Sequence, residues 1–290
     1  MEILVAKHAG FCFGVKRAIN MAEDCAKEAE GRIYTLGPII HNPQVVKELE
    51  KSGISAIKAL DDIENGTVII RSHGVTSDEM RIVQDKGVKV VDATCPFVKK
   101  THEYVELLIR EGYSVIVVGD KDHPEVRGIL SYGGKDIMAV ASVEDLKDMP
   151  RKKRIGIVAQ TTQSIENLQT VVAHCLKKAS ELKIFNTICN ATSVRQQESI
   201  ELAKQVDCMI VIGGRNSANT NRLTEICRKI QPKTYHIEVP EELEKLNLNG
   251  AQKVGITAGA STPSWIIEKT IDCLRDKKAN KLETKGECSG

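Results

Sequence analysis

The sequence predicts an α/β protein made of three similar small α/β modules in a pseudo-threefold arrangement around a central cavity. Two observations predict this fold. Short runs of β-branched residues alternate with longer stretches of helical periodicity, which is typical of βα units. The same order of strand, cysteine turn, helix, strand and polar turn also occurs three times along the chain. This repeat is much longer than that of a solenoid protein, so it favours three small domains.

The first strand of each predicted module leads to a cysteine at the turn before a helix. These strands are expected at residues 3–6, 88–93 and 183–188, and the cysteines that follow are Cys12, Cys95 and Cys189. Helical stretches then run through Glu30, Arg110 and Val206. The recurrence of a cysteine in one local context indicates a shared role for the three thiols.

The second strand of each module ends in a glycine and a polar turn. These strands are expected at residues 33–36, 115–118 and 209–212. A polar residue follows the cysteine of its module at nearly the same distance, 29, 28 and 28 residues, at His41, His123 and Ser217. This agreement supports three copies of one structural unit.

A third strand closes each module, at residues 67–70, 155–158 and 254–257. These strands lead to His73, Thr161 and Ser261, which lie 61, 66 and 72 residues after the three cysteines. We therefore predict modules at residues 1–87, 88–182 and 183–276. A polar tail at 277–290 is expected to be disordered. The sequence leaves open whether the first strand pairs within module 1 or with module 3.

The turns of all three modules are predicted to converge. In parallel α/β sheets, ligands bind outside the carboxyl ends of the strands, and each of these turns follows a strand. The side chains expected to face one cavity are Cys12, Cys95, Cys189, His41, His73, His123, Thr161, Ser217, Asn219 and Ser261.

Three thiolates around one point form a metal site, and their softness favours zinc, Cu(I) or an iron–sulfur cluster. A structural zinc takes four protein ligands, whereas three cysteines would leave one iron of a [4Fe–4S] cluster open to a substrate oxygen. The alternative interpretation is that the cysteines are small buried apolar residues. The other six of the nine cysteines lack matched positions and are expected to be packing or surface residues.

The polar turns are predicted to bind phosphate. Helix N-termini attract anions, so histidine, serine, threonine and asparagine donors at three such ends suit a diphosphate. Taken singly, His41, His73 and His123 also fit structural histidines, and serine and threonine are ordinary N-caps.

Glu125 is the candidate proton donor. It lies in the first turn of the helix that begins after His123. A neighbouring cluster and diphosphate would raise its proton affinity, as a general acid requires, whereas the helix N-terminus would lower it. The alternative is a glutamate that only complements the helix dipole.

The composition excludes several classes of function. The 290 residues carry a net charge of +2 and only 3% aromatic residues, which argues against a nucleic-acid partner. No apolar run is long enough for a membrane span or a signal peptide, so a cytoplasmic protein is expected. An odd number of cysteines without a Cys-x-x-Cys pair does not suit a disulfide framework. Residues 10–14 lack the Rossmann spacing, so no nucleotide cofactor is indicated.

Several ordered motifs resemble those of the 4-hydroxy-3-methylbut-2-enyl diphosphate reductase (IspH/LytB) family, over residues 1 to about 275. They are Gly10-Phe11-Cys12-Phe13-Gly14-Val15, Val91-Asp92-Ala93-Thr94-Cys95-Pro96, His123-Pro124-Glu125-Val126, Gln160-Thr161-Thr162, Asn216-Ser217-Ala218-Asn219-Thr220-Asn221-Arg222-Leu223 and Thr257-Ala258-Gly259-Ala260-Ser261. Many relatives carry Ser-Ser-Asn where this chain has Ser217-Ala218-Asn219, so a hydroxyl contact at 218 is lost while a backbone contact remains available.

The resemblance implies a trefoil-like fold around a [4Fe–4S] cluster held by Cys12, Cys95 and Cys189, with one open iron. It implies that Glu125 and Thr161 deliver protons. The diphosphate would be bound by His41, His73, His123, Thr161, Ser217, Ala218, Asn219 and Ser261. The implied reaction is the reductive dehydroxylation of (E)-4-hydroxy-3-methylbut-2-enyl diphosphate to isopentenyl and dimethylallyl diphosphates, the last step of the non-mevalonate isoprenoid pathway. Since no flavin or nicotinamide motif is visible, electrons are expected from an external ferredoxin or flavodoxin. A monomer is expected.

Two other classes of function stay open at this point. A redox-neutral hydro-lyase of the aconitase type also uses a three-cysteine cluster, but it needs carboxylate-binding arginines, and the turns offer only Arg71 and Arg215. The non-enzyme alternative is a structural metal protein or a redox sensor.

Overall fold

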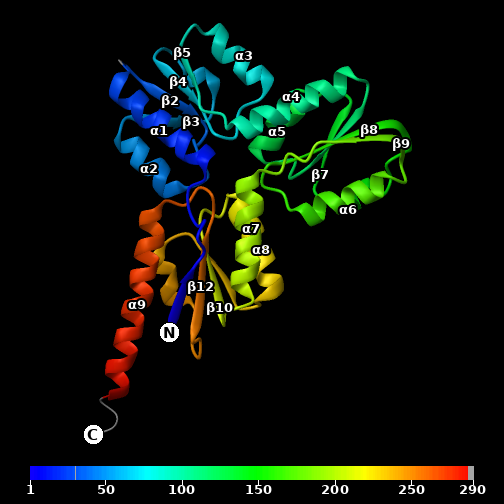
Figure 1. The fold of residues 1–290 in the computed structure, drawn as a ribbon. Helices are drawn as coiled ribbons and strands as arrows, with labels where there is room; N and C mark the ends of the chain where they lie inside the picture. Colours follow the sequence, from blue (N-terminus) through cyan, green and yellow to red (C-terminus); the bar gives the residue numbers. More distant parts are fainter. Residues whose placement is uncertain (30, 287–290) are drawn as a thin grey trace. The chain divides into compact units, whose positions relative to one another are not determined.

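The computed structural model describes residues 1–29 and 31–286, the last ten of them by their backbone only. Three parallel sheets of four strands each, with helices packed on their faces, make up the fold (Figure 1). The α/β class and the presence of three similar modules are therefore confirmed. The chain divides into two compact units, a terminal unit (residues 1–12 and from 194 onward) and a central unit (residues 13–193).

The terminal unit contains one sheet with the strand order β1-β12-β10-β11. Its strands are β1 (Glu2–Val5), β10 (Cys208–Ile212), β11 (Thr234–Ile237) and β12 (Lys253–Ala258). Its helices are α8 (Ala218–Ile230), α9 (Ser264–Gly286), the short η3 (Pro240–Lys245) and most of α7 (Asn190–Ala203). Alternate residues of β10 face opposite sides of the sheet: Ile210 and Ile212 pack in the α9 core, and Met209 and Val211 pack in the α8 core.

The central unit contains two sheets. The first, with the order β3-β2-β4-β5, consists of β2 (Ile33–Leu36), β3 (Ile54–Ile57), β4 (Thr67–Ile70) and β5 (Lys89–Asp92). Its helices are α1 (Phe13–Glu28), α2 (Pro43–Lys51), η1 (Leu60–Asp62) and α3 (Ser77–Asp85). Every residue of β2 and β4 is buried, as expected for central strands of a sheet covered on both faces.

The second sheet of the central unit has the order β7-β6-β8-β9. Its strands are β6 (Ser114–Val118), β7 (Ile137–Val140), β8 (Lys152–Ala159) and β9 (Ala179–Ile184). Its helices are α4 (Pro96–Arg110), α5 (Pro124–Ser131), η2 (Val143–Leu146) and α6 (Ile165–Cys175). Val115 and Val117 of β6 pack with α4 and α5, whereas Ile116 and Val118 pack with α6.

The first strand of the chain joins the last sheet. β1 pairs in parallel with β12, with Ile3 opposite Val254, which answers the question that the sequence left open. The other two sheets follow the same rule: β5 pairs with β4, and β9 pairs with β8. Each strand that the sequence analysis placed at the start of a module therefore pairs with the sheet of the module before it.

Two predicted segments differ from the structure. The strand expected at residues 183–188 is β9 at Ala179–Ile184, because the ladder with the long strand β8 starts earlier and Thr187 instead bonds to Ala159 through its hydroxyl group. The disorder expected for 277–290 is wrong for residues 277–286, which continue helix α9; their Lys-, Glu-, Ala- and Leu-containing sequence favours a helix. Residues 287–290 lie outside the described part of the chain, as does Glu30 beyond the end of α1.

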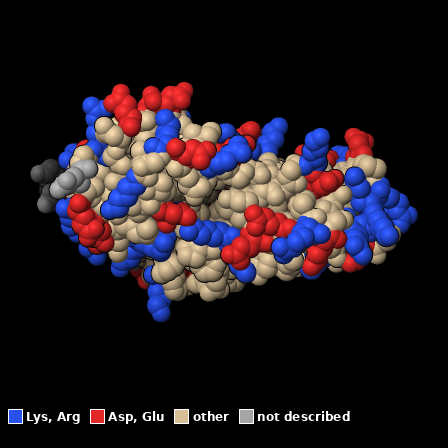
Figure 2. Space-filling model, turned by 90° about the horizontal axis from the view of Figure 1, so that it is seen from above, with Lys and Arg blue, Asp and Glu red and all other residues tan. Residues whose placement is uncertain are grey.

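The surface carries charges of both signs. Lys and Arg side chains are interspersed with Asp and Glu side chains over most of the face in view (Figure 2), in keeping with a net charge of +2. No helix in the described residues is both long enough and apolar enough to cross a membrane.

Candidate functional site

The carboxyl ends of the central unit's strands carry most of the predicted site residues. His41 follows β2, His73 follows β4, and Cys95 follows β5 in the first sheet. In the second sheet, His123 and Glu125 follow β6, Thr161 follows β8, and Cys189 follows β9. This is the location that parallel α/β sheets use for ligands.

The structure brings the three predicted histidines of the central unit together. The ring centroids of His41 and His73 lie 4.1 Å apart, and the ring of His123 lies 5.2 and 5.5 Å from them. We call these residues the histidine cluster. Since His41 and His73 come from one sheet and His123 from the other, the cluster is a product of tertiary structure.

The environment of the histidine cluster favours uncharged rings. Burial, together with the charges of His123 and Arg71, lowers the pKa of His41 to about 4. Burial also lowers the pKa of His123 to about 4 and that of His73 well below its usual value. At neutral pH the three imidazoles are therefore neutral, and each can donate one N–H.

One hydrogen bond decides which kind of ligand the cluster suits. One ring nitrogen from each of the three histidines lies within 4.8 Å of the other two, a spacing that also allows a metal ion. However, Nδ1 of His123 accepts the backbone N–H of Glu125 at 3.1 Å, so the neutral ring carries its proton on Nε2. A protonated Nε2 donates to an anion and does not ligate a metal. The geometry therefore favours an anion such as phosphate over a metal.

Glu125, whose backbone N–H donates to His123 of the histidine cluster, carries a buried carboxyl group. Glu125 is 2% exposed and accepts hydrogen bonds from the backbone N–H of Thr161 at 2.6 Å and from its hydroxyl group at 2.9 Å. Burial raises the pKa of Glu125 to about 7, although both hydrogen bonds act to lower it. A pKa near neutrality suits a general acid, because the group is available both to give and to accept a proton.

The three cysteines predicted to be metal ligands each make the same kind of backbone hydrogen bond. The backbone N–H of Cys95 donates to the carbonyl of Ser72 at 2.9 Å, and that of Cys189 donates to the carbonyl of Thr161 at 3.0 Å. In the terminal unit, the N–H of Cys12 donates to the carbonyl of Ala260 at 3.1 Å. Each cysteine is thus hydrogen-bonded to the turn after the third predicted strand of the preceding module. For Cys12, in the first module, the partner turn belongs to the third module.

These cysteines differ from the other described cysteines in exposure. Cys12, Cys95 and Cys189 are each partly exposed and lie at the start of a helix. By contrast, burial raises the pKa of Cys175 to about 11 and that of Cys227 to about 12, so these two are packing residues. Three partly exposed thiols are soft donors of the kind that can hold an iron–sulfur cluster.

The terminal unit carries the remaining residues that are predicted to bind an anion, most of them at the start of helix α8. Ser217 is the N-cap of this helix and accepts the backbone N–H of Thr220 at 3.3 Å, and Ala218 is its first residue. Asn219 is 3% exposed, yet neither atom of its amide group finds a partner within the described residues. Ser261 is buried at the turn after β12. A buried amide without a partner at a helix N-terminus indicates a place for an anionic ligand.

Sequence reasoning missed two residues that hold the segment leading to Cys12. Arg195 of α7 is 3% exposed and donates to backbone carbonyls of segment 7–10 at 2.8 and 3.1 Å. Glu198, one turn further along, accepts two backbone N–H groups of the same segment at 2.7 and 2.9 Å. No local sequence signal distinguishes the buried Arg195 and the half-buried Glu198 from the charges of an ordinary exposed helix face.

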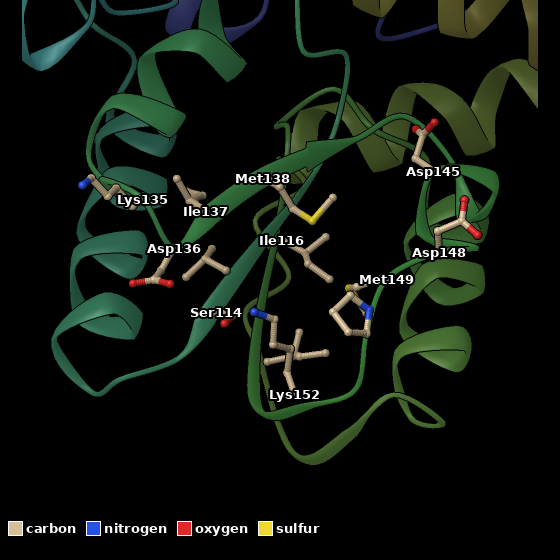
Figure 3. Close-up of a pocket in the computed structure, with 13 residues that line it drawn as sticks. Ser114, Ile116, Lys135, Asp136, Ile137, Met138, Asp145, Asp148, Met149 and Lys152 are labelled. Atoms are coloured by element: carbon tan, nitrogen blue, oxygen red, sulfur yellow. The ribbon is translucent and has the colours of Figure 1, made fainter.

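A cavity of about 390 Å³ lies beside the second sheet of the central unit, away from the candidate site (Figure 3). It is lined by Ser114, Lys135, Asp136 and Lys152, which stand at or before the amino ends of β6, β7 and β8. Glu125 and Thr161 follow the carboxyl ends of β6 and β8, so this cavity is not part of the candidate site.

The fold and these side chains define a class of protein: an α/β enzyme whose thiols, histidines and buried acid stand at the carboxyl ends of parallel strands. The model of the LytB protein family matches residues 3–275. The chain belongs to this family.

Relatives and solved structures agree with this assignment. The 4-hydroxy-3-methylbut-2-enyl diphosphate reductase of Geobacter metallireducens is 57% identical over 95% of this chain and 98% of its own length. That of Pelobacter propionicus is 56% identical over 93% and 96%. A solved structure of (E)-4-hydroxy-3-methyl-but-2-enyl diphosphate reductase, the terminal enzyme of the non-mevalonate pathway, is 49% identical over 95% of this chain and all of its own, with a TM-score of 0.70. The Plasmodium falciparum reductase structure is 29% identical over 93% and 87%, with a TM-score of 0.88.

Proposed function

We propose that this chain is a 4-hydroxy-3-methylbut-2-enyl diphosphate reductase. It removes the hydroxyl group of (E)-4-hydroxy-3-methylbut-2-enyl diphosphate with two electrons and two protons, giving isopentenyl or dimethylallyl diphosphate and water. The observation that carries the proposal is the histidine cluster beside buried Glu125, which pairs an anion receptor with a proton donor. The family match over residues 3–275 supports the particular reaction.

The diphosphate end of the substrate is bound by neutral donors. His41, His73 and His123 each offer an N–H, and Nε2 of His123 is fixed as a donor by its capping bond to Glu125. The N-terminus of α8 contributes Ser217, the backbone N–H of Ala218 and the amide of Asn219, and Ser261 contributes a hydroxyl group. Many neutral donors hold a phosphate firmly without a dense cluster of cations.

Glu125 and Thr161 move the proton that the leaving hydroxyl group needs. Protonated Glu125 gives up its proton, and the carboxylate that results is stabilised by the two hydrogen bonds from Thr161. Burial keeps bulk water away from this pair, so the proton is held until the substrate accepts it.

Cys12, Cys95 and Cys189 would hold a [4Fe–4S] cluster, which supplies the two electrons when bound. The electrons come from an external donor such as a ferredoxin or flavodoxin.

Two measurements on one anaerobic preparation test the proposal. Iron and sulfide analysis is expected to give about four of each per chain. Incubation with (E)-4-hydroxy-3-methylbut-2-enyl diphosphate, dithionite and a viologen mediator is expected to yield isopentenyl and dimethylallyl diphosphates. A colourless zinc-containing protein, or an isomerised substrate without electron consumption, would contradict the proposed reduction.

A further inference from the structure

Arg71 stands at the first turn position after β4 and holds the turn that carries His73. Its Nε donates to the carbonyl of Gly74 at 3.0 Å, and the N–H of Gly74 donates to the carbonyl of Arg71 at 3.0 Å. His73 is therefore enclosed in a turn that the Arg71 side chain and backbone both close. Gly74 has a φ of +75°, a conformation that favours glycine.

The neighbouring strand leaves room for the guanidinium group. Gly37, the residue after β2, has a φ of +71°, and a Cβ added there would lie 2.5 Å from Nη1 of Arg71. A side chain at position 37 would displace the guanidinium. Gly37 precedes His41 by four residues, so the arginine lies over the loop that leads to a second member of the histidine cluster.

The positive charge of Arg71 has no carboxylate partner. Among the side chains that the structure describes, no Asp or Glu oxygen lies within 4.0 Å of its guanidinium. The nearest acid in electrostatic terms is Glu79, whose carboxylate is already occupied by the N–H and hydroxyl group of Thr76 at 2.7 and 2.9 Å. A partly buried cation without a counter-charge is costly, which indicates that an anionic ligand completes the site.

The charge of Arg71 acts on the whole histidine cluster. It lowers the pKa of His41, of His73 and of His123, in each case adding to the larger effect of burial. Other charges facing these groups are Asp120, which raises the pKa of His123, and Arg127, which lowers that of Arg71. The neutral rings supply N–H donors but no charge, whereas a diphosphate carries several negative charges.

We propose that Arg71 is an electrostatic and positioning residue for the substrate's diphosphate group: its guanidinium supplies a fixed positive charge at the histidine cluster and holds the His73 turn. This inference rests on the proposed function, because it takes the anion at the cluster to be a diphosphate. Arg71 thus converts a set of neutral donors into a site selective for a highly charged anion.

The test uses the full-length chain without cluster and inorganic diphosphate as the probe, in isothermal titration calorimetry. Arg71→Gln is expected to weaken binding at least about tenfold, whereas Arg71→Lys, which keeps the charge, is expected to retain most of it. The matched control is Arg81→Gln, which removes an exposed arginine paired with Asp78 on α3 and is expected to bind like wild type. In the loaded enzyme, Arg71→Gln should raise KM and leave kcat nearly unchanged.

A second readout separates charge from local structure. Proton NMR titration of the histidine rings in the Arg71→Gln variant is expected to show higher pKa values for all three members of the cluster. If Arg71 acted only by closing the turn, Arg71→Lys would lose as much affinity as Arg71→Gln, and the three pKa values would not rise together; this result would overturn the inference. Equal diphosphate affinity in wild type and Arg71→Gln would also overturn it. Absence of binding by the wild type would instead reject the diphosphate site itself.

Discussion

Glu125 and Thr161 are joined by two hydrogen bonds, although they lie on separate segments 36 residues apart in the chain. The contact forms because both residues follow the carboxyl ends of β6 and β8, which are paired neighbours in one sheet. The backbone carbonyl of Thr161 also accepts a hydrogen bond from the N–H of Cys189 at 3.0 Å. The carboxyl group of Glu125, the hydroxyl group of Thr161 and the backbone N–H of Cys189 therefore belong to one hydrogen-bonded network.

The raised pKa of Glu125 makes the stability of the fold depend on pH. The folded-state pKa of about 7 lies above the usual 4.5, so its stabilising contribution is complete below pH 4.5 and is lost as the pH rises through 7. Glu125→Gln cannot ionise and is expected to gain up to ~3 kcal/mol over wild type between pH 5 and pH 8. Urea unfolding of the cluster-free chain at both pH values measures this. A difference between the two proteins that does not change with pH would be inconsistent with a buried, titrating Glu125.

The reaction rate is expected to depend on the protonation state of Glu125. A general acid must be protonated, so kcat/KM should fall by about tenfold for each pH unit above 7. Initial rates between pH 6 and pH 9, with visible absorbance recorded at each pH to check the cluster, test this. A flat profile over this range, at constant cluster content, would remove Glu125 as the acid.

His123 is the N-cap of α5, and we propose that it is also an N–H donor to the diphosphate. His123→Asn is expected to keep the cap, since asparagine is a strong N-cap residue, but to lose the donor at Nε2. His123→Ala is expected to lose both, at an additional cost of about 1 kcal/mol in stability. Calorimetry with inorganic diphosphate and thermal unfolding of both variants separate the roles. If His123→Asn bound diphosphate as tightly as wild type, the donor role would be wrong.

The histidine cluster predicts proton uptake on binding. The pKa values of His41 and His123, about 4, lie below the usual 6.5, so these two rings contribute stability above pH 6.5 that is lost as the pH falls toward 4. A bound diphosphate favours protonated rings and is expected to raise these values. Titration of diphosphate at pH 6 in two buffers of different ionisation enthalpy should therefore reveal protons taken up. Identical heats in both buffers would argue against coupling.

Arg195 and Glu198 are expected to protect Cys12. Without their hydrogen bonds, segment 7–10 is released, so Arg195→Met and Glu198→Gln should accelerate alkylation of Cys12 in the cluster-free chain. Cys95 and Cys189 serve as internal controls, since their own backbone contacts are untouched. Mass spectrometry of alkylated peptides measures all three sites at once. Uniform acceleration at the three cysteines would indicate general unfolding rather than a local effect.

Much of the fold could be predicted because the strands and turns of each repeat consist of residue types that are characteristic of these local structures. Central strands such as β4 and β10 are continuous apolar runs, and each is followed by glycine or polar residues that form a turn. The edge strands β3, β7 and β11 are not predicted from the sequence, because a strand of four residues that is only partly buried lacks a clear pattern. The pairing of β1 with β12 joins residues 251 positions apart in the chain, such as Ile3 and Val254, and no local pattern encodes such a contact.

The sequence could predict the histidine cluster as a group of neighbouring side chains, but it could not predict the electrostatics of the candidate site. Spacing after the cysteines indicated His41 and His123, and the structure places both in one cluster. From the sequence, a neighbouring cluster and diphosphate would raise the proton affinity of Glu125 and the helix N-terminus would lower it. In the structure a third effect, burial, raises its pKa to about 7. Arg195 and the uncompensated charge of Arg71 depend on tertiary burial, so they had no signal in the sequence.

The most direct test compares product formation by wild type, Glu125→Gln and Glu166→Gln at equal iron content. Glu166 also lies in the first turn of a helix, α6, but is exposed, so it controls for the loss of a helix-dipole charge. With dithionite, a viologen mediator and (E)-4-hydroxy-3-methylbut-2-enyl diphosphate, wild type and Glu166→Gln should form both isoprenoid diphosphates. Glu125→Gln should keep its brown colour and lose at least about 100-fold in rate. Turnover by Glu125→Gln at the wild-type rate would contradict the account.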